Sequence, residues 1–388
     1  MAEEPEWIAK LNRHLEIEVF RSHEQLRGVW ATLQDEACCT VFQTYNWMAP
    51  LLDKVGSALS AAPAIVLVSS KSGTPLMLVP MAERQQGAMR ILEFIDFGIC
   101  DYNAPIIRRD FAAELAGQDF SNVWRQILAR LDRVDVVNLQ KMPSVIGEAP
   151  NPFTQLTCQD DLLAFNCPIG SDFADYMKTR SSNMNRELRR SRRKLEAIAP
   201  VELRVASDPE TGDALMRSIL AHKSAWCRAS GVCDLLAQPA YTDFYRTIAQ
   251  QEVNGIAHTG ALMVGDRMIA GIFGLVWRGR FYGLIQCSDF ENYRAYSPGS
   301  LLLAEVIRWS CENGISLFDF SIGSESYKGR WADEEQQLYQ HGQAFSVMGK
   351  LVDMRRRAVA GFKSRAHPQL VETLRTLRNK TGAPAQSW

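Results

Sequence analysis

The sequence lacks most features of secreted, membrane-spanning or metal-dependent proteins. Its nine cysteines are an odd number and include no Cys-x-x-Cys pair, so we expect a reduced chain without a structural zinc or other metal site. The acidic start MAEEPEWIAKLNRHLEIEVF has no apolar run and is unlike a signal peptide. No window approaches about 18 uninterrupted apolar residues, so no membrane-spanning helix is expected. We therefore expect a cytoplasmic protein.

Charge and missing motifs exclude further classes of function. The net charge is −1, so the whole chain is not built to bind nucleic acid and no DNA partner is expected. There is no Walker loop, no dinucleotide-binding fingerprint and no metal-ligand spacing. The hydrophobic fraction of 46% and the charged fraction of 22% are those of a globular protein. Because 388 residues exceed one ordinary core, we expect two domains.

Hydrophobic periodicity predicts two α/β units with a similar order of elements. The first unit contains a strand at residues 15–21 and two helices. Three strands, the second of them at residues 75–83, then a helix and a last strand follow. A linker rich in proline is expected at residues 143–157. The second unit begins with one long basic helix over residues 172–199 and ends with a helix after Pro298 and two strands. A helix over residues 208–229 is expected between them, with Asp208 as its cap and Pro209 at its first position. In the helix after Pro298, an apolar side that includes Leu302, Val306 and Ile307 is expected to face the core. The predicted domains are residues 1–150, residues 151–349 and a basic helical tail at residues 350–388.

A proline and a glycine open the last long helix. The sequence Ser297-Pro298-Gly299 follows a predicted strand at residues 281–288 and a polar loop. Free N–H groups at a helix start bind anions, together with the positive end of the helix dipole. Glycine lets a phosphate approach the backbone, and proline at the first turn wastes no donor. This pattern favours a diphosphate site, and an ordinary helix start after a tight turn is the alternative.

The stretch from Arg280 to Trp331 resembles the CelD/BcsL-type acyltransferases. These belong to the GNAT superfamily of N-acetyltransferases and are related to the FemAB transferases. The matching positions are Ser297-Pro298-Gly299, Gly314, Asp319-Phe320, Tyr327-Lys328 and Trp331. Weaker matches are Phe42-Gln43 with Trp47, Asp101-Tyr102, and His222 with Trp226. The resemblance implies two tandem GNAT-like domains, each a mixed central sheet flanked by helices, with acetyl-CoA or another acyl-CoA as donor.

The resemblance also implies roles for individual residues. Residues expected to hold the donor are Arg294, Ser297, Pro298, Gly299, Ser300 and Leu301. The catalytic candidates are Asp319 as base, Glu325 as second choice, Tyr327 as proton donor to the thiolate, and Lys328. Alternatively, Asp319 caps a turn or pairs with Lys328, and Tyr327 is a core aromatic.

A second group of residues is expected to contact an acceptor sugar. Its members are Gln43, Trp47, Asp101, Tyr102, His222 and Trp226. Stacking and hydrogen bonds would serve a sugar at such positions. Core packing of the histidine and tryptophan, and local turn chemistry around Asp101, are the alternatives.

Two basic runs stand out against the neutral whole. Residues 178–196 carry eight Lys or Arg against two Glu, and nine Lys or Arg against two acids follow from Lys350 onward. A solvated helix face is one reading of each run. The other readings are an anionic membrane surface, a nucleotide or tRNA. In the tail, the anion-binding candidates for cyclic di-GMP are Arg355, Arg356, Arg357, Lys363 and Arg365.

Three functions remain open from the sequence. The leading one is an N-acyltransferase that acts on an amino group of a sugar or glycan precursor in bacterial envelope or extracellular polysaccharide biosynthesis. The second is a FemAB-like peptidyl transferase that uses aminoacyl-tRNA. The third is a non-catalytic protein that senses cyclic di-GMP through the basic tail, and a peripheral position at the inner membrane is an open alternative for the compartment.

Overall fold

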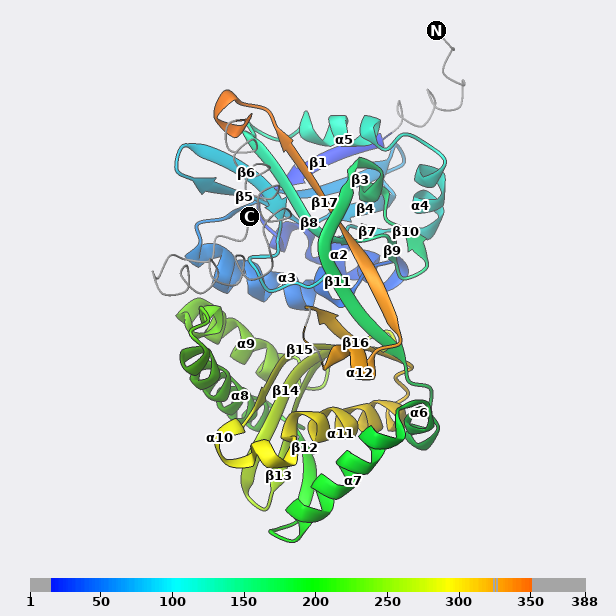
Figure 1. Ribbon diagram of the computed structural model, residues 1–388. Helices are drawn as coiled ribbons and strands as arrows, with labels where there is room; N and C mark the ends of the chain where they lie inside the picture. Colours follow the sequence, from blue (N-terminus) through cyan, green and yellow to red (C-terminus); the bar gives the residue numbers. More distant parts are fainter. Residues whose placement is uncertain (1–14, 324, 326, 351–388) are drawn as a thin grey trace, which may run out of the picture. The chain divides into compact units, whose positions relative to one another are not determined.

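The structure is a computed structural model that describes residues 15–323, 325 and 327–350 (Figure 1). These residues form two compact units: unit 1 holds residues 15–162 and 337–350, and unit 2 holds residues 163–336. The chain leaves unit 1 within strand β11 (Cys158–Pro168) and returns within strand β17 (Glu334–Ala344). This division differs from the predicted boundaries at residues 150 and 349, because the chain changes unit inside two strands rather than in loops. From residue 351 onward the predicted tail lies outside the described residues, with its anion-binding candidates Arg355, Arg356, Arg357, Lys363 and Arg365.

Unit 1 contains strands of three sheets and several short helices. The elements before β11 are β1 (Leu15–Phe20), α2 (Arg27–Glu36), α3 (Tyr45–Leu51), β2 (Ala62–Pro63), β3 (Ile65–Ser70), β4 (Pro75–Val79), β5 (Met81–Gln86), β6 (Met89–Phe94), β7 (Ile106–Ile107), α4 (Arg109–Ala116), α5 (Ser121–Leu128), β8 (Val136–Pro143), β9 (Val145–Ile146) and β10 (Ala149–Pro150). One sheet has the order β1-β3-β4-β7, and a second consists of β9 and β10 alone. In the third sheet, the strands that belong to unit 1 have the order β17-β8-β6-β5-β2, with β6 and β8 parallel. The single strand predicted over residues 75–83 is two strands in different sheets, because Pro80 between them donates no ladder hydrogen bond.

The predicted linker at residues 143–157 belongs to the core of unit 1. It forms β9, β10 and a 3₁₀ turn at Pro152–Leu156. Phe153 is fully buried, and its ring lies 5.7 Å from that of Phe94 and 5.6 Å from that of Trp124. The prolines that suggested a linker end β8 (Pro143), end β10 (Pro150) and open the 3₁₀ turn (Pro152), beside buried aromatic packing.

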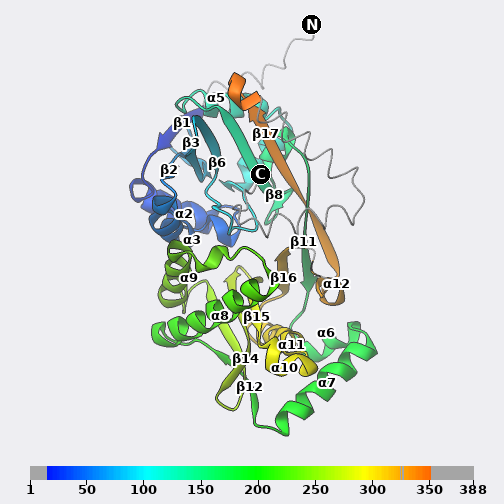
Figure 2. The ribbon, with the colours of Figure 1, turned by 60° about the vertical axis from the view of Figure 1, so that its left-hand side comes forward.

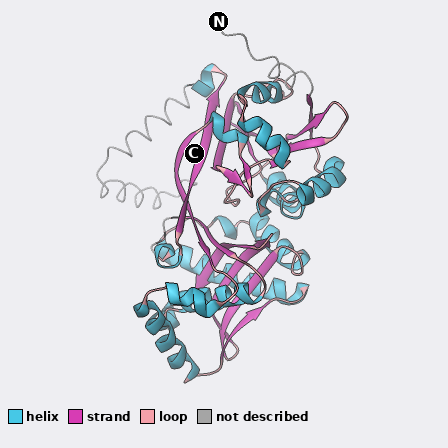
Figure 3. Cartoon of the chain, turned by 90° about the vertical axis from the view of Figure 1, so that its right-hand side faces the viewer, coloured by secondary structure: helices cyan, strands magenta, loops and turns pink. Residues whose placement is uncertain are grey.

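Unit 2 is one mixed sheet flanked by helices (Figures 1 and 3). Its elements between β11 and β17 are α6 (Phe173–Thr179), α7 (Ser182–Glu196), β12 (Val201–Val205), α8 (Pro209–Ser230), α9 (Pro239–Gln251), β13 (Ala257–Val264), β14 (Arg267–Trp277), β15 (Arg280–Ser288), α10 (Phe290–Tyr293), α11 (Pro298–Glu312), β16 (Leu317–Ile322) and α12 (Lys328–Trp331). The strand order is β12-β13-β14-β15-β16-β11, and only β15 and β16 run parallel.

Helices α8 and α11 cover opposite faces of this sheet. A Cβ added to Gly271 in β14 would meet Ile219 of α8, whereas one added to Gly299 in α11 would meet Gln286 and Ser288 of β15. Gly271 pairs with Cys287 in the sheet, so Cys287 faces α8. Its neighbours Gln286 and Ser288 face α11. As the sequence predicts, Leu302, Val306 and Ile307 of α11 are buried, each worth roughly 1.5–3 kcal/mol of burial.

The basic helix predicted over residues 172–199 is two helices. Asp172 caps α6, and the hydroxyl of Ser181 accepts a hydrogen bond from the N–H of Met184 to cap α7. Between them Arg180 is extended, with its guanidinium on the carbonyl of Trp331 and the carboxylate of Asp333. This buried attachment turns the chain, which a helical periodicity does not reveal.

Candidate active site

Strands β15 and β16 separate to form a fork. They pair in parallel only from Arg280 to Tyr282 of β15, against Leu317 to Asp319 of β16. Beyond Tyr282, β15 keeps β14 as a neighbour on one edge, and no strand of the described residues pairs with its other edge. The backbone groups on that edge are therefore open to a partner other than protein.

We call the point where the two strands separate, at Tyr282 and Asp319, the vertex of the fork. A β-bulge lies in each strand just past it. Leu284 of β15 has no partner on β14, and Phe320 of β16 has none on β11. The next residue, Ser321, is buried with φ of 60°, an unusual conformation outside glycine. Bulges bend a strand and increase its twist, which is how two parallel strands diverge within one sheet.

The N-terminal turn of α11, which we call the mouth of α11, lies at the end of β15 on the face of the sheet that α11 covers. Ser297 is exposed and left-handed (φ 49°), and it turns the chain into Pro298. Gln286 of β15 donates from Nε2 to the carbonyl of Gly299 at 2.9 Å. A Cβ on Gly299 would stand 3.1 Å from the Gln286 amide nitrogen and 3.1 Å from Ser288 Oγ. Glycine therefore allows the helix to start close against β15.

The donors at this mouth are not all available. The N–H groups of Ser300 and Leu301 both donate to the carbonyl of Ser297. Within the described chain this leaves the N–H of Gly299 as the open donor of the first turn. The side chain of Arg294 is exposed just before it, and Leu301 is buried in the core. Of the predicted donor-binding residues, Arg294 and Gly299 thus offer groups to a ligand, and the others shape the turn.

Asp319 lies at the vertex of the fork and is fully buried. Its carboxylate pairs with the guanidinium of Arg280 on β15 and accepts the N–H of Ser321 at 2.7 Å. The contact with the N–H of Ser321, two residues along the chain, is a local turn of the kind given as an alternative, and Arg280 is a cation that the sequence analysis did not name. A carboxylate that is buried and paired between two strands is better suited to hold the vertex as a fixed charge than to act as a base that exchanges protons with solvent.

The loop after β16 carries the other catalytic candidates. Lys328 is buried, and its Nζ donates to the carbonyl of Ile322 at 2.6 Å and pairs with exposed Glu325 at 3.1 Å. Tyr327 is half-buried, and burial, followed by the charge of Glu325, raises the pKa of its hydroxyl. The tyrosine hydroxyl therefore stays protonated, while Lys328 ties the end of β16 to α12.

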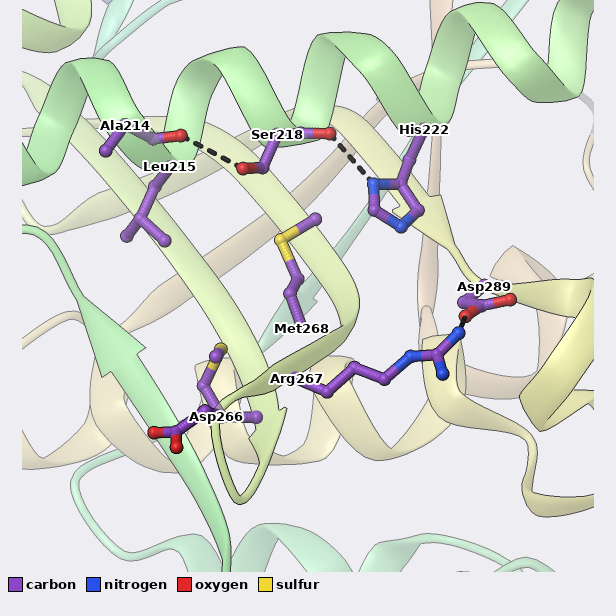
Figure 4. Close-up of a pocket in the computed structure, with 9 residues that line it drawn as sticks. Ala214, Leu215, Ser218, His222, Asp266, Arg267, Met268 and Asp289 are labelled. Atoms are coloured by element: carbon purple, nitrogen blue, oxygen red, sulfur yellow. Dashed lines mark hydrogen bonds and ion pairs between the residues drawn. The ribbon is translucent and has the colours of Figure 1, made fainter.

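A hollow of about 500 Å³ lies on the α8 face of unit 2 (Figure 4). The side chain of His222 on α8 lines this hollow, and its Nδ1 lies 2.9 Å from the carbonyl oxygen of Ser218. Because a carbonyl only accepts, Nδ1 carries the hydrogen and Nε2 of the neutral ring is an acceptor. Arg267 and Asp289 form an ion pair of 2.7 Å across the hollow. This hollow lies on the opposite face of the sheet from the mouth of α11.

The other predicted sugar contacts are not gathered around this hollow. Trp226 is 42% exposed one turn beyond His222 and stacks under Lys223, with Nζ 4.5 Å from the ring. In unit 1, Gln43 and Trp47 are fully buried: Gln43 donates to the carbonyl of Tyr102 at 2.8 Å, and Trp47 Nε1 lies 3.3 Å from Cys100 Sγ. Tyr102 is also buried, so these three side chains do not reach solvent. Asp101 is half-buried.

Sequence reasoning missed the residues that build the fork. Arg280 and Gln286 carry its two anchoring contacts, to Asp319 and to Gly299. A signal was present for one of them, since a carboxylate inside an apolar strand requires a cation nearby. No sequence signal marks the bulges at Leu284 and Phe320, because a bulge is defined by the register with a neighbouring strand.

Comparison with known proteins identifies the class of unit 2. Residues 182–329 match the model of the acetyltransferase (GNAT) domain. The fold is similar to FemX (TM-score 0.56, 9% identity, covering 83% of this chain and 96% of that chain). It is also similar to a protein of unknown function from Bacteroides thetaiotaomicron VPI-5482 (0.50, 13%, 84% and 99%).

A third similar structure is the C-terminal DUF2156 domain of a lysylphosphatidylglycerol synthetase from Agrobacterium fabrum (TM-score 0.50, 11% identity, covering 84% of this chain and 95% of that chain). Identities this low show the fold alone. Among curated proteins, no sequence matches this chain. The expected α/β fold, with mixed sheets flanked by helices in tandem units, is confirmed. The chain carries an acetyltransferase domain of the GNAT type and is an acyltransferase.

Proposed function

We propose that unit 2 transfers an acyl group from acyl-CoA, with acetyl-CoA as first choice, to an amino group of a sugar or glycan precursor. The observation that carries this proposal is the fork between β15 and β16, with the mouth of α11 at its wide end. An extended donor arm fits an unpaired strand edge, because its amides replace the missing strand. Backbone groups from Gly283 to Ser288 would hold that arm.

The phosphates of the donor would bind where β15 meets α11. The open N–H of Gly299 and the positive end of the helix dipole favour an anion there. The exposed guanidinium of Arg294 adds a cation beside it. Gln286 fixes the carbonyl of Gly299 and thereby the direction of the first helical turn.

The chemistry requires two proton transfers around one acyl exchange. The amine attacks the thioester carbonyl, the C–N bond forms, the C–S bond breaks, and the amine proton leaves to a base. Tyr327 is our candidate hydrogen-bond donor to the leaving thiolate: burial raises the pKa of its hydroxyl, so the proton stays on the tyrosine oxygen and the thiolate takes its proton from solvent. Asp319 was the first candidate for the base, and its burial makes exposed Glu325 the better-placed carboxylate.

The acceptor rests on the resemblance to the CelD/BcsL-type acyltransferases. On this basis we choose an amino sugar or a glycan precursor of bacterial envelope or extracellular polysaccharide biosynthesis as the acceptor. The reaction would take place in the cytoplasm. None of the helices in the described ranges is long and apolar enough to cross a membrane. An intact-mass screen of amino-sugar acceptors with acetyl-CoA tests this choice directly.

Substitution of Gly299 tests the donor site. We expect Gly299→Val to weaken acyl-CoA binding at least tenfold, because its side chain would enter the space of Gln286 and Ser288 and block the backbone N–H. Isothermal titration with acetyl-CoA measures the affinity, and circular dichroism checks the fold. Gly28→Ala is the matched control, since a Cβ at Gly28 meets nothing within 4 Å. Unchanged affinity in folded Gly299→Val would remove the phosphate site from α11.

A FemAB-like transfer from aminoacyl-tRNA is the second candidate function. The likeness to FemX, which extends over 83% of this chain, favours it. Parallel thermal-shift assays with acetyl-CoA, charged tRNA and cyclic di-GMP separate the readings, since a ligand at 100 times its dissociation constant stabilises by about 2.7 kcal/mol. Stabilisation by charged tRNA without any by acetyl-CoA would replace the first proposal. The third reading, cyclic di-GMP on the tail, concerns residues outside the described chain and stays a prediction.

A further inference from the structure

Helix α7 presents five exposed cations on one face. They are Arg186, Arg189, Arg190, Arg193 and Lys194. At about 100° per residue these positions fall within an arc of roughly 140°. The opposite face of the helix packs on the core of unit 2 through Met184, Leu188 and Leu195. We call the five residues the α7 cation face, and α7 lies beside α11 at the edge of unit 2 (Figures 1 and 2).

The acids of α7 do not neutralise this face. Glu187 accepts from Arg330 at 2.8 Å, and Glu196 accepts from Arg192 at 2.8 Å. Among the described residues, none of the five cations has an ion-pair partner, and Arg186 contacts only the amide oxygen of Asn183. Five positive charges in two helical turns therefore remain uncompensated in a chain whose net charge is −1.

We propose that the α7 cation face binds an anionic lipid surface. No aromatic side chain stands among the five cations to stack on a base, which single-stranded nucleic acid would use. Ile198, in the turn that ends the helix, is 58% exposed. An apolar side chain gains from a lipid interface and gains nothing from a phosphodiester backbone.

The chain's own tail is not the occupant of this face. From Lys350 onward it carries nine basic residues against two acidic ones, so it would be repelled. Because the apolar side of α7 is already buried in the core, the helix binds at the surface of the bilayer without insertion. Each Lys or Arg near an anionic leaflet raises the partition coefficient about fivefold. Five of them give roughly three to four orders of magnitude at low salt.

Co-sedimentation with vesicles tests the proposal on the full chain. The vesicles are phosphatidylcholine alone and phosphatidylcholine with about 30% phosphatidylglycerol. We expect binding only to the anionic vesicles, and a loss of about 100-fold in the Arg189→Gln/Arg190→Gln/Arg193→Gln variant. The matched control neutralises three other cations of unit 2, Arg204, Arg217 and Arg228, and is expected to change binding less than threefold.

A third variant separates the helix from the tail. If Arg355→Gln/Arg356→Gln/Arg357→Gln abolishes vesicle binding while the α7 variant retains it, the tail binds the membrane and the proposal is overturned. If bulk tRNA binds in an α7-dependent manner and the vesicles do not, the partner is a nucleic acid and the proposal is equally overturned. Acetyl-CoA titration of the same variants is an independent readout, so failure of the donor proposal leaves the vesicle result intact.

Discussion

Replacement of Arg280 by methionine decides whether Asp319 is a base or half of a fixed ion pair. Asp319 is 0% exposed, whereas the side chain of Arg280 is 23% exposed. Loss of one partner of a buried pair costs about 3–5 kcal/mol, because the remaining charge is left in a low-dielectric site. The carboxylate keeps the N–H of Ser321, so we expect Arg280→Met to lower the free energy of unfolding by about 3 kcal/mol.

The double variant supplies the decisive comparison. Asp319→Asn removes the charge and keeps the shape, so Arg280→Met/Asp319→Asn no longer buries a carboxylate without its cation. We expect a coupling energy of about 2 kcal/mol in the double-mutant cycle, as for residues in direct contact. Arg204→Met is the control, because Arg204 pairs with exposed Glu202 at 3.0 Å and surface pairs of this kind contribute about 0–1 kcal/mol.

Urea denaturation and thiol release from acetyl-CoA are the two assays. A general base would lose about 10²–10⁴ in turnover as Asp319→Asn, with no recovery in the double variant. A carboxylate that holds the vertex would lose less than about tenfold, and the double variant would recover part of the turnover lost in Arg280→Met. Additive stability effects, combined with an unrecovered loss of turnover, would refute the reasoning.

Two further substitutions test other buried groups. Burial lowers the pKa of His258 from 6.5 to about 3, so between these pH values the histidine is protonated in the unfolded chain and neutral in the folded chain. Its contribution to the free energy of unfolding is therefore full above pH 6.5 and falls by about 2 kcal/mol at pH 5. His258→Leu should remove this part of the pH dependence, and identical slopes for both proteins in urea denaturation between pH 7.5 and 5 would contradict it. Lys328→Met should speed amide exchange at Ser321 and Ile322 and lower turnover more than acetyl-CoA affinity, because Nζ no longer holds the Ile322 carbonyl. Unchanged exchange by mass spectrometry would show that Lys328 does not fix the end of β16.

Local patterns predicted elements well where the signal lies within one segment. Helix α8 begins at Pro209 after Asp208, whose carboxylate accepts the N–H of Thr211, as the sequence indicates. The apolar stripe of α11 is buried as expected. Both features are determined by residues at most four positions apart in the chain, so they can be predicted from the sequence.

The fork depends on contacts between distant segments, and its details were therefore not predictable. Arg280 and Asp319 are 39 residues apart, and nothing local marks them as a pair. Gln43 and Trp47 matched the family pattern, but a matched pattern does not distinguish a residue that binds a sugar from one that packs the core. Their burial in unit 1 comes from tertiary contacts with Tyr102 and Cys100.

The entry and exit of the chain through β11 and β17 have a consequence for synthesis on the ribosome. Strand β17 pairs with β8 of unit 1, but all of residues 163–336 are made between them. At about 5–20 residues per second this interval lasts on the order of 9–35 s. During that time the edge of β8 that β17 later covers stays open, so the nascent chain exposes an unpaired strand edge until β17 has been made.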